Sequence, residues 1–174
     1  MGSNTTGTNN VAVGANALDA NTTSSNNTAV GNAALGANTT GSENTALGYS
    51  ALENNTTGAS NTAAGAYALE ENTTGDNNTA LGYLALTANT TGSSNTGIGK
   101  DSLRDNTTGA DNTGCGTFTL RGLTTGSYNT AVGRGALINN NGDSNTGVGR
   151  AALYTNTTGI QTVSYTHLTL PTTR

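Results

Sequence analysis

The hydrophobic and polar residues of this chain follow a pattern that repeats every 17 residues. One copy, residues 44–60, reads N-T-A-L-G-Y-S-A-L-E-N-N-T-T-G-A-S. Every interval between units is 17 residues except the last, which is 16, and each unit begins with an asparagine: Asn10, Asn27, Asn44, Asn61, Asn78, Asn95, Asn112, Asn129 and Asn145. A unit this short cannot enclose a core of its own, so we interpret it as one coil of a stack.

Positions two to four of the unit predict a short β-strand. Position two is threonine in eight of the nine units, position three is alanine or glycine, and position four is mostly aliphatic. Because side chains alternate between the two faces of a strand, positions two and four share one face. We expect that face to point into the core, with Cys115 at position four buried as a small hydrophobic residue. Position three would then form a flat outer strip that another chain could approach closely.

Two positions never vary. Position five is glycine, which ends the strand by supplying a positive φ or room for a close backbone approach. These structural turn residues are Gly14, Gly31, Gly48, Gly65, Gly82, Gly99, Gly116, Gly133 and Gly149. Position nine is leucine, the largest regular residue of the predicted structural core, at Leu18, Leu35, Leu52, Leu69, Leu86, Leu103, Leu120, Leu137 and Leu153.

The N-T-T-G sequence near the end of the unit predicts a turn, because asparagine tolerates left-handed backbone and bonds its own main chain. Glycine and Thr-Thr in every unit leave no helical run longer than about seven residues, and such helices are marginal. We therefore predict an all-β fold, a parallel β-solenoid of about nine coils. Stacked asparagines at positions one and twelve are expected to form amide ladders.

The repeat divides the chain into three segments. Residues 1–9 are a partial leading repeat, residues 10–161 are the solenoid domain, and residues 162–174 share no pattern with it. The missing residue of the short unit falls in a turn, where Asn140-Asn141-Gly142 replaces N-T-T-G, which leaves the apolar positions in phase. The tail is interpreted as disordered or as a sequencing or assembly artefact, since Ser164 to Arg174 resembles translated sequencing adapter. A genuine terminal cap is the alternative.

Composition excludes several classes of protein. Six lysines and arginines are spread singly in a chain of net charge −4, which argues against a nucleic-acid partner. The lone Cys115 excludes an intrachain disulfide and a cysteine metal cluster. The sequence has neither an apolar run of roughly 20 residues for membrane insertion nor a visible signal peptide.

The segment Asn10-Val11-Ala12-Val13-Gly14 resembles the N-S-V-A-I-G motif of YadA-type trimeric autotransporter adhesin heads. The whole 17-residue unit is similar to the repeat arrays of phage tail-fibre proteins and related bacterial surface fibres, over about residues 4 to 161. The resemblance implies left-handed β-rolls wound as a homotrimer, with the V-A-V-G strand near the three-fold axis. It also implies an extracellular, cell-surface or virion location. The head unit has 14 residues, however, and threonine at position two makes the strand face here more polar.

No catalytic, cofactor-binding or metal site is expected, and we do not expect an enzyme. His167 has no partner nucleophile, and the glycines of Gly97-Ile98-Gly99-Lys100 continue the repeat because the first glycine of a phosphate loop is missing, Ser94 standing in its place. Carboxylates do not recur in register, which argues against repeated calcium sites.

The variable positions six and seven carry the candidate partner-binding surface. Residues that vary on a fixed scaffold lie outside the core, and aromatic or arginine side chains there could contact a host-surface protein or a glycan receptor. These residues are Tyr49, Tyr67, Tyr83, Lys100, Phe118, Arg134 and Arg150. Ordinary solvent-facing variation is the alternative.

We therefore expect a structural and adhesive rod of an extracellular fibre. The alternative function is ice binding by the rows of threonine at positions thirteen and fourteen. Adjacent threonines in extended backbone send their side chains to opposite faces, which weakens that alternative.

Overall fold

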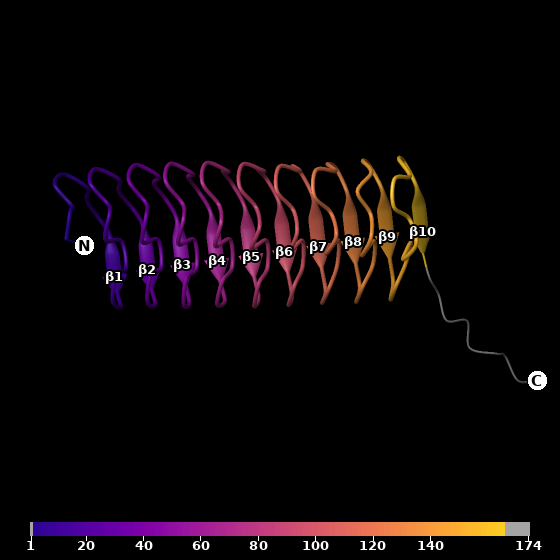
Figure 1. Cartoon of the computed structure of the whole chain (residues 1–174), viewed down its shortest axis with the longest axis horizontal. Coiled ribbons are helices and arrows are strands. Elements are labelled where there is room, and N and C mark those ends of the chain that lie inside the picture. The colour runs from indigo at the N-terminus through magenta and orange to yellow at the C-terminus, as the bar shows by residue number, and fades with distance from the viewer. Residues whose placement is uncertain (1, 166–174) are drawn as a thin grey trace, which may run out of the picture.

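The computed structural model describes residues 2–165 as a single straight rod of stacked coils (Figure 1). Each coil contributes one three-residue strand, and the ten strands form one parallel sheet in sequence order. The strands are β1 (Val11–Val13), β2 (Thr28–Val30), β3 (Thr45–Leu47), β4 (Thr62–Ala64), β5 (Thr79–Leu81), β6 (Thr96–Ile98), β7 (Thr113–Cys115), β8 (Thr130–Val132), β9 (Thr146–Val148) and β10 (Val163–Tyr165). The predicted parallel β-solenoid is confirmed.

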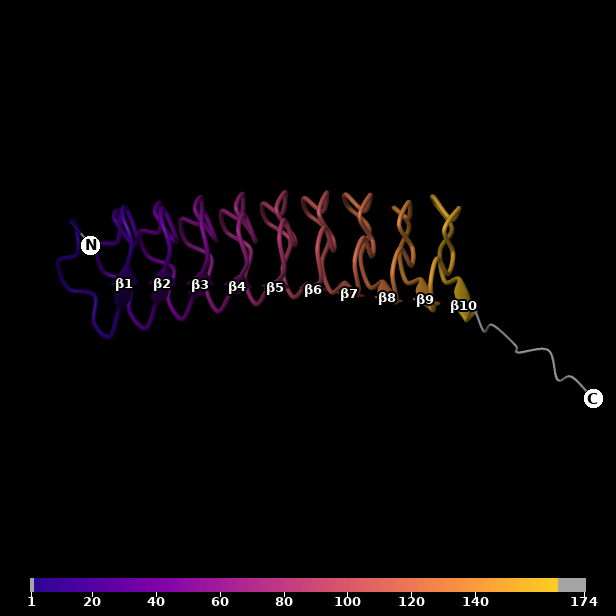
Figure 2. The same ribbon diagram turned by 90° about the horizontal axis from the view of Figure 1, so that it is seen from below.

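Equivalent positions of successive units lie beside one another along the sheet. Ala29 pairs with Ala46 and Ala46 with Ala63, in each case with the residue 17 positions along. At the shortened unit Thr130 pairs with Thr146, so the deletion is absorbed in the turn and the strands stay in register. The turned view shows the strands along one side of the rod (Figure 2).

The predicted orientation of the strand is wrong. Alanine at position three is fully buried in β2, β3, β4, β5 and β8, while position four faces solvent, with Val30 38% and Leu47 42% exposed. Cys115 is likewise exposed rather than buried. The cause is the narrow coil: a methyl group added at Gly97, also position three, would lie 3.3 Å from Leu86 Cγ, so the interior has no room for valine or leucine there. Positions two and four therefore form an outer face, here called the strand face.

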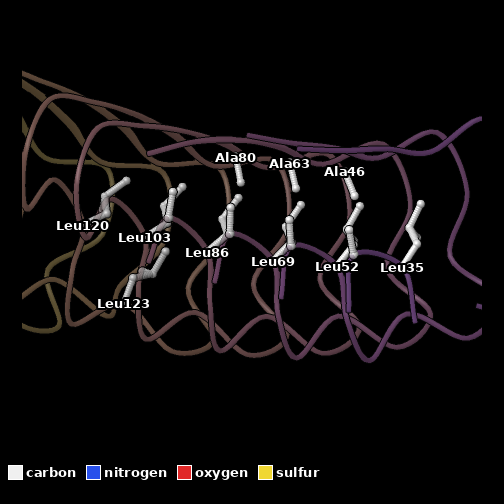
Figure 3. Packing of buried hydrophobic residues seen from close by; sticks show 14 of the residues in the cluster. Leu35, Ala46, Leu52, Ala63, Leu69, Ala80, Leu86, Leu103, Leu120 and Leu123 are labelled. Atoms are coloured by element: carbon white, nitrogen blue, oxygen red, sulfur yellow. The ribbon is translucent and has the colours of Figure 1, made fainter. Parts of the chain in front are cut away.

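The core is a single file of leucines lined by alanines. The leucines of position nine are fully buried from Leu18 to Leu137, and Leu153 in the last full coil is partly buried. Figure 3 shows Ala46, Ala63 and Ala80 of the strands directed toward this file. The leucine backbone is left-handed in every coil, with φ between 48° and 54°, an unfavourable conformation for a branched residue that the packing of the file must offset.

The invariant glycine of position five takes a positive φ, between 112° and 141°, as expected. A methyl group on Gly48 would lie 2.7 Å from the carbonyl oxygen of Gly65 in the next coil. Both the conformation and the close approach therefore require glycine at this corner.

The asparagines of position twelve form the predicted amide ladder. In most coils the side-chain Nδ2 donates to Oδ1 of the asparagine one coil earlier, at 2.8 Å from Asn72 to Asn55 and from Asn89 to Asn72. At position one of the early coils the donor is the backbone N–H instead of the side-chain amide. The N–H of Asn44, for example, donates to Oδ1 of Asn27 at 2.9 Å. Both asparagines of a coil also donate to the carbonyl oxygen of the glycine at position fifteen, as Asn44 and Asn55 do to Gly58.

The amide ladder of position twelve is interrupted where leucine replaces asparagine. Leu123 occupies position twelve of its coil and is fully buried. Asn106, one coil earlier, consequently has a buried Oδ1 atom without a hydrogen-bond partner.

The sheet continues past residue 161, the last residue of the predicted solenoid domain. Strand β10 pairs in register with β9, and the Thr162 N–H donates to Asn145 Oδ1 at 2.9 Å, as an asparagine of position one would. The rest of the tail, including His167, lies outside the described residues.

Candidate receptor-binding ladder

The loop that follows the glycine corner holds positions six and seven at the rod surface. The backbone at position seven is left-handed, with φ of 59° at Tyr67 and 63° at Phe118. Its N–H donates to the position-six carbonyl of the preceding coil, at 2.9 Å from Tyr67 to Tyr49 and 3.0 Å from Phe118 to Lys100. These side chains are therefore carried on backbone that is hydrogen-bonded from coil to coil.

Three tyrosines form the first part of a continuous surface row. The ring centroids of Tyr49 and Tyr67 lie 5.2 Å apart at 72°, and those of Tyr67 and Tyr83 lie 6.1 Å apart at 78°. Both are edge-to-face contacts, the geometry that aromatic quadrupoles favour. Tyr49 and Tyr83 remain 52% and 47% exposed, so the rings also present surface to solvent.

Cationic side chains extend the row toward the C-terminal coils. The Lys100 ammonium lies 5.8 Å from the Tyr83 ring centroid and 5.9 Å from that of Phe118. The guanidinium groups of Arg121 and Arg134 lie 5.6 Å and 5.9 Å from the Phe118 centroid. We call the row from Tyr49 to Arg134 the aromatic–cation ladder.

The tyrosine part of the ladder has an acidic border. Desolvation by the surrounding protein raises the pKa of Tyr67. Electrostatic interaction with the adjacent Tyr49, Tyr83, Glu70 and Glu53 raises this pKa further. Tyr67 therefore keeps its hydroxyl proton and can donate a hydrogen bond throughout the neutral range.

A cavity of about 340 Å³ lies at the C-terminal end of the ladder. Three arginines and two aromatic rings line it together with small or aliphatic residues: Phe118, Arg121, Arg134, Gly135, Ile138, Arg150, Ala151 and Tyr154. The cavity opens where position seven becomes small, since a methyl group on Gly135 would meet no atom within 4 Å. None of these lining residues is acidic.

The seven residues predicted from sequence are brought together in two overlapping groups. Six of them make the ladder, and Arg150 joins Phe118 and Arg134 around the cavity. Sequence reasoning missed Arg121, Ile138 and Tyr154, which all come from position ten. That position also varies between units, so the criterion that selected positions six and seven would have found it.

Comparison of the chain with protein-family models, with curated proteins and with solved structures finds no match. Residues 2–165 include no helix of the length and hydropathy that a membrane span requires. Within the same range, histidine, cysteine and carboxylate side chains nowhere gather in threes as a metal site would need.

Proposed function

We propose that this chain is a structural and adhesive rod of an extracellular fibre, of the kind found in phage tail fibres and bacterial surface adhesins. The aromatic–cation ladder carries the proposal. Aromatic and arginine side chains are the residues that dominate binding energy at interfaces, and here they are aligned along a rigid axis. A rod that keeps such a row at fixed spacing suits repeated contact with a surface glycan or protein.

The strand face supports association of the rod with copies of itself. It carries an aliphatic residue in most coils, with Leu81 37%, Ile98 39% and Val132 40% exposed. A row of exposed aliphatic side chains is typical of an interaction surface. We propose a homotrimer assembled through this face, in which positions two and four, rather than position three, make the seam.

Ice binding is the second candidate function. Fewer threonine hydroxyls are free to bind ice than the two rows at positions thirteen and fourteen suggest. The position-thirteen hydroxyls donate to the next coil, as from Thr56 to the Thr73 carbonyl at 3.0 Å, so only position fourteen is fully exposed in that row. A regular alternative is threonine at position two on the strand face, which the homotrimer would cover. Thermal hysteresis in the purified protein separates the two functions.

Binding to immobilised cell-surface glycans and to whole cells tests the adhesive function. We expect retention by at least one surface, and a loss of about tenfold or more in the double variant Tyr67→Ala/Phe118→Ala, as for removal of interface anchors. Tyr128→Ala is the matched control, because Tyr128 is 65% exposed and lies off the ladder. Equal loss in the control, or no retention of the unaltered protein, contradicts the proposal.

A further inference from the structure

The charges of this chain are segregated along the rod. Residues 1–99 contain six carboxylates and no lysine or arginine, whereas residues 100–174 contain all six cations and four carboxylates, so the two parts carry −6 and +2. The sum is the net −4 of the chain. The positive charge is therefore confined to the C-terminal part of a rod that is otherwise acidic.

Most of this positive charge converges on one side of the rod. Arg104 is neutralised at 2.7 Å by Asp105 and lies outside the 340 Å³ cavity. Arg121 and Arg134, within the described part of the chain, make no salt bridge and instead flank Phe118. Arg150 completes the lining from the following coil.

Lys100, Arg121, Arg134 and Arg150 come from four successive coils. Parallel strands are spaced by about 4.8 Å, so these cations are distributed over about 14 Å along the rod. A linear ligand with several negative groups matches this distribution better than a single small anion.

The cavity also offers rings beside the charges. Phe118 and Tyr154 both line it, together with the small residues Gly135 and Ala151. A volume of about 340 Å³ lies within the range of small-ligand sites. A pyranose ring presents C–H groups that pack on an aromatic face, and its carboxylate or sulfate group pairs with arginine.

From these features we infer that the cavity at Phe118, Arg121, Arg134 and Arg150 binds an anionic saccharide, carboxylated or sulfated, as part of a polysaccharide that runs along the rod axis. This inference rests on the proposed adhesive function and names the chemical class of the receptor. The arginines pair with the acidic groups, and Phe118 and Tyr154 stack on the sugar rings.

Calorimetric titration of the full chain tests this with four probes at physiological ionic strength. Oligogalacturonate supplies carboxylates, a heparin oligosaccharide supplies sulfates, a maltooligosaccharide is neutral, and linear polyphosphate is anionic without sugar rings. We expect the carboxylated or the sulfated sugar to bind about tenfold or more tightly than both the neutral sugar and polyphosphate. The better of the two identifies the acidic group, and weaker binding at high salt is expected for either.

Variants locate the site. Arg134→Gln and Arg121→Gln should each weaken binding by about tenfold, whereas Arg104→Gln removes the same charge outside the cavity and should change affinity less than about twofold. Ala151→Leu should also weaken binding because it fills the cavity with every charge kept. Leucine is accepted at this position of the unit, as at Leu84, and circular dichroism verifies the fold.

Three results overturn the inference: equal loss in Arg104→Gln, tight binding of Ala151→Leu, or polyphosphate binding as strongly as either acidic sugar. If the neutral sugar or cells bind through the tyrosines while acidic sugars do not, the inference fails and the adhesive rod stands. If no surface or saccharide binds, both fail.

Discussion

At the scale of single residues, the rod depends on buried asparagine amides as much as on leucine. A coil contributes one leucine and mostly two alanines to the apolar core, and the asparagines at positions one and twelve are fully buried beside them. Each buried amide needs partners, because an unpaired one costs about 1–3 kcal/mol. The amide ladder therefore fixes the register of the coils as well as stabilising them.

Exchanging asparagine and leucine at position twelve tests the amide ladder. Asn72→Leu should lower the free energy of unfolding by about 2–3 kcal/mol, because it leaves Asn55 Oδ1 unpaired and removes the bond to the Gly75 carbonyl. The reverse change, Leu123→Asn, loses the burial of a leucine but supplies a donor to the orphaned Asn106 Oδ1, so stability should change by less than about 1 kcal/mol. Chemical denaturation measures both, and similar losses in the two variants would argue against the ladder.

The carboxylate of Glu70, beside the aromatic–cation ladder, should make stability depend on pH. Burial and the charges of Glu71 and Glu53 raise the pKa of Glu70 above 4.5. The folded chain thus binds this proton more tightly than the unfolded chain does, so stability falls as the pH rises from about 4.5 through the raised pKa. Glu70→Gln should therefore have a higher thermal midpoint than the unaltered protein at pH 7 and an equal one at pH 3. Asp111→Asn, at an exposed site, serves as control, and an unchanged midpoint for Glu70→Gln at pH 7 refutes the prediction.

At the scale of the element, the three-residue strand separates interior from seam. The sequence predicts that positions two and four share a face, but alternation alone does not decide which face is inside. Side-chain size predicts that positions two and four lie inside, whereas the file of leucines leaves room only for the alanine or glycine of position three. The deciding quantity is the space within the coil, which depends on how the corners at Gly48 and its equivalents close, and no local pattern reports it.

Cys115 is a natural probe of this orientation. Its thiol lies on the strand face, so in dilute folded protein it should react with a thiol reagent within about tenfold of its rate in denaturant. At concentrations where sedimentation gives three times the chain mass, the seam should protect it. Protection at every concentration, including that of the monomer, would mean that position four points inward.

The candidate site shows the same division between what sequence can and cannot reveal. Variation at positions six and seven identified the ladder residues, because a repeat exposes what is not conserved between its own units. The contact of Phe118 with Arg121, and the place of Tyr154 in the cavity lining, require the loop after the strand to lie beside the segment after the leucine. The backbone at Leu120 and Leu153 is left-handed there, a conformation that the sequence did not indicate.

At the scale of the whole molecule, the chain is a rod whose surfaces have separate proposed roles. The strand face repeats a threonine and, in most coils, an aliphatic residue along its length, which suits contact with identical chains. The ladder changes character along the axis, from tyrosines bordered by glutamates to arginines around Phe118. Regular surfaces suit self-association and variable ones suit recognition, because only the latter carry information about a partner.

Tyrosine emission, titrated with the glycan best retained by the unaltered protein, tests the central claim that this ladder is the receptor surface. The chain has no tryptophan, so its emission comes from six tyrosines, and four of them border the ladder or its cavity: Tyr49, Tyr67, Tyr83 and Tyr154. Replacing these four with phenylalanine keeps the rings for stacking and leaves Tyr128 and Tyr165 to emit. We expect the glycan to change the emission of the unaltered protein, and the fourfold variant to lose this change while calorimetry shows affinity within about threefold. A full emission change in the fourfold variant would mean that the glycan binds away from the aromatic–cation ladder and its cavity.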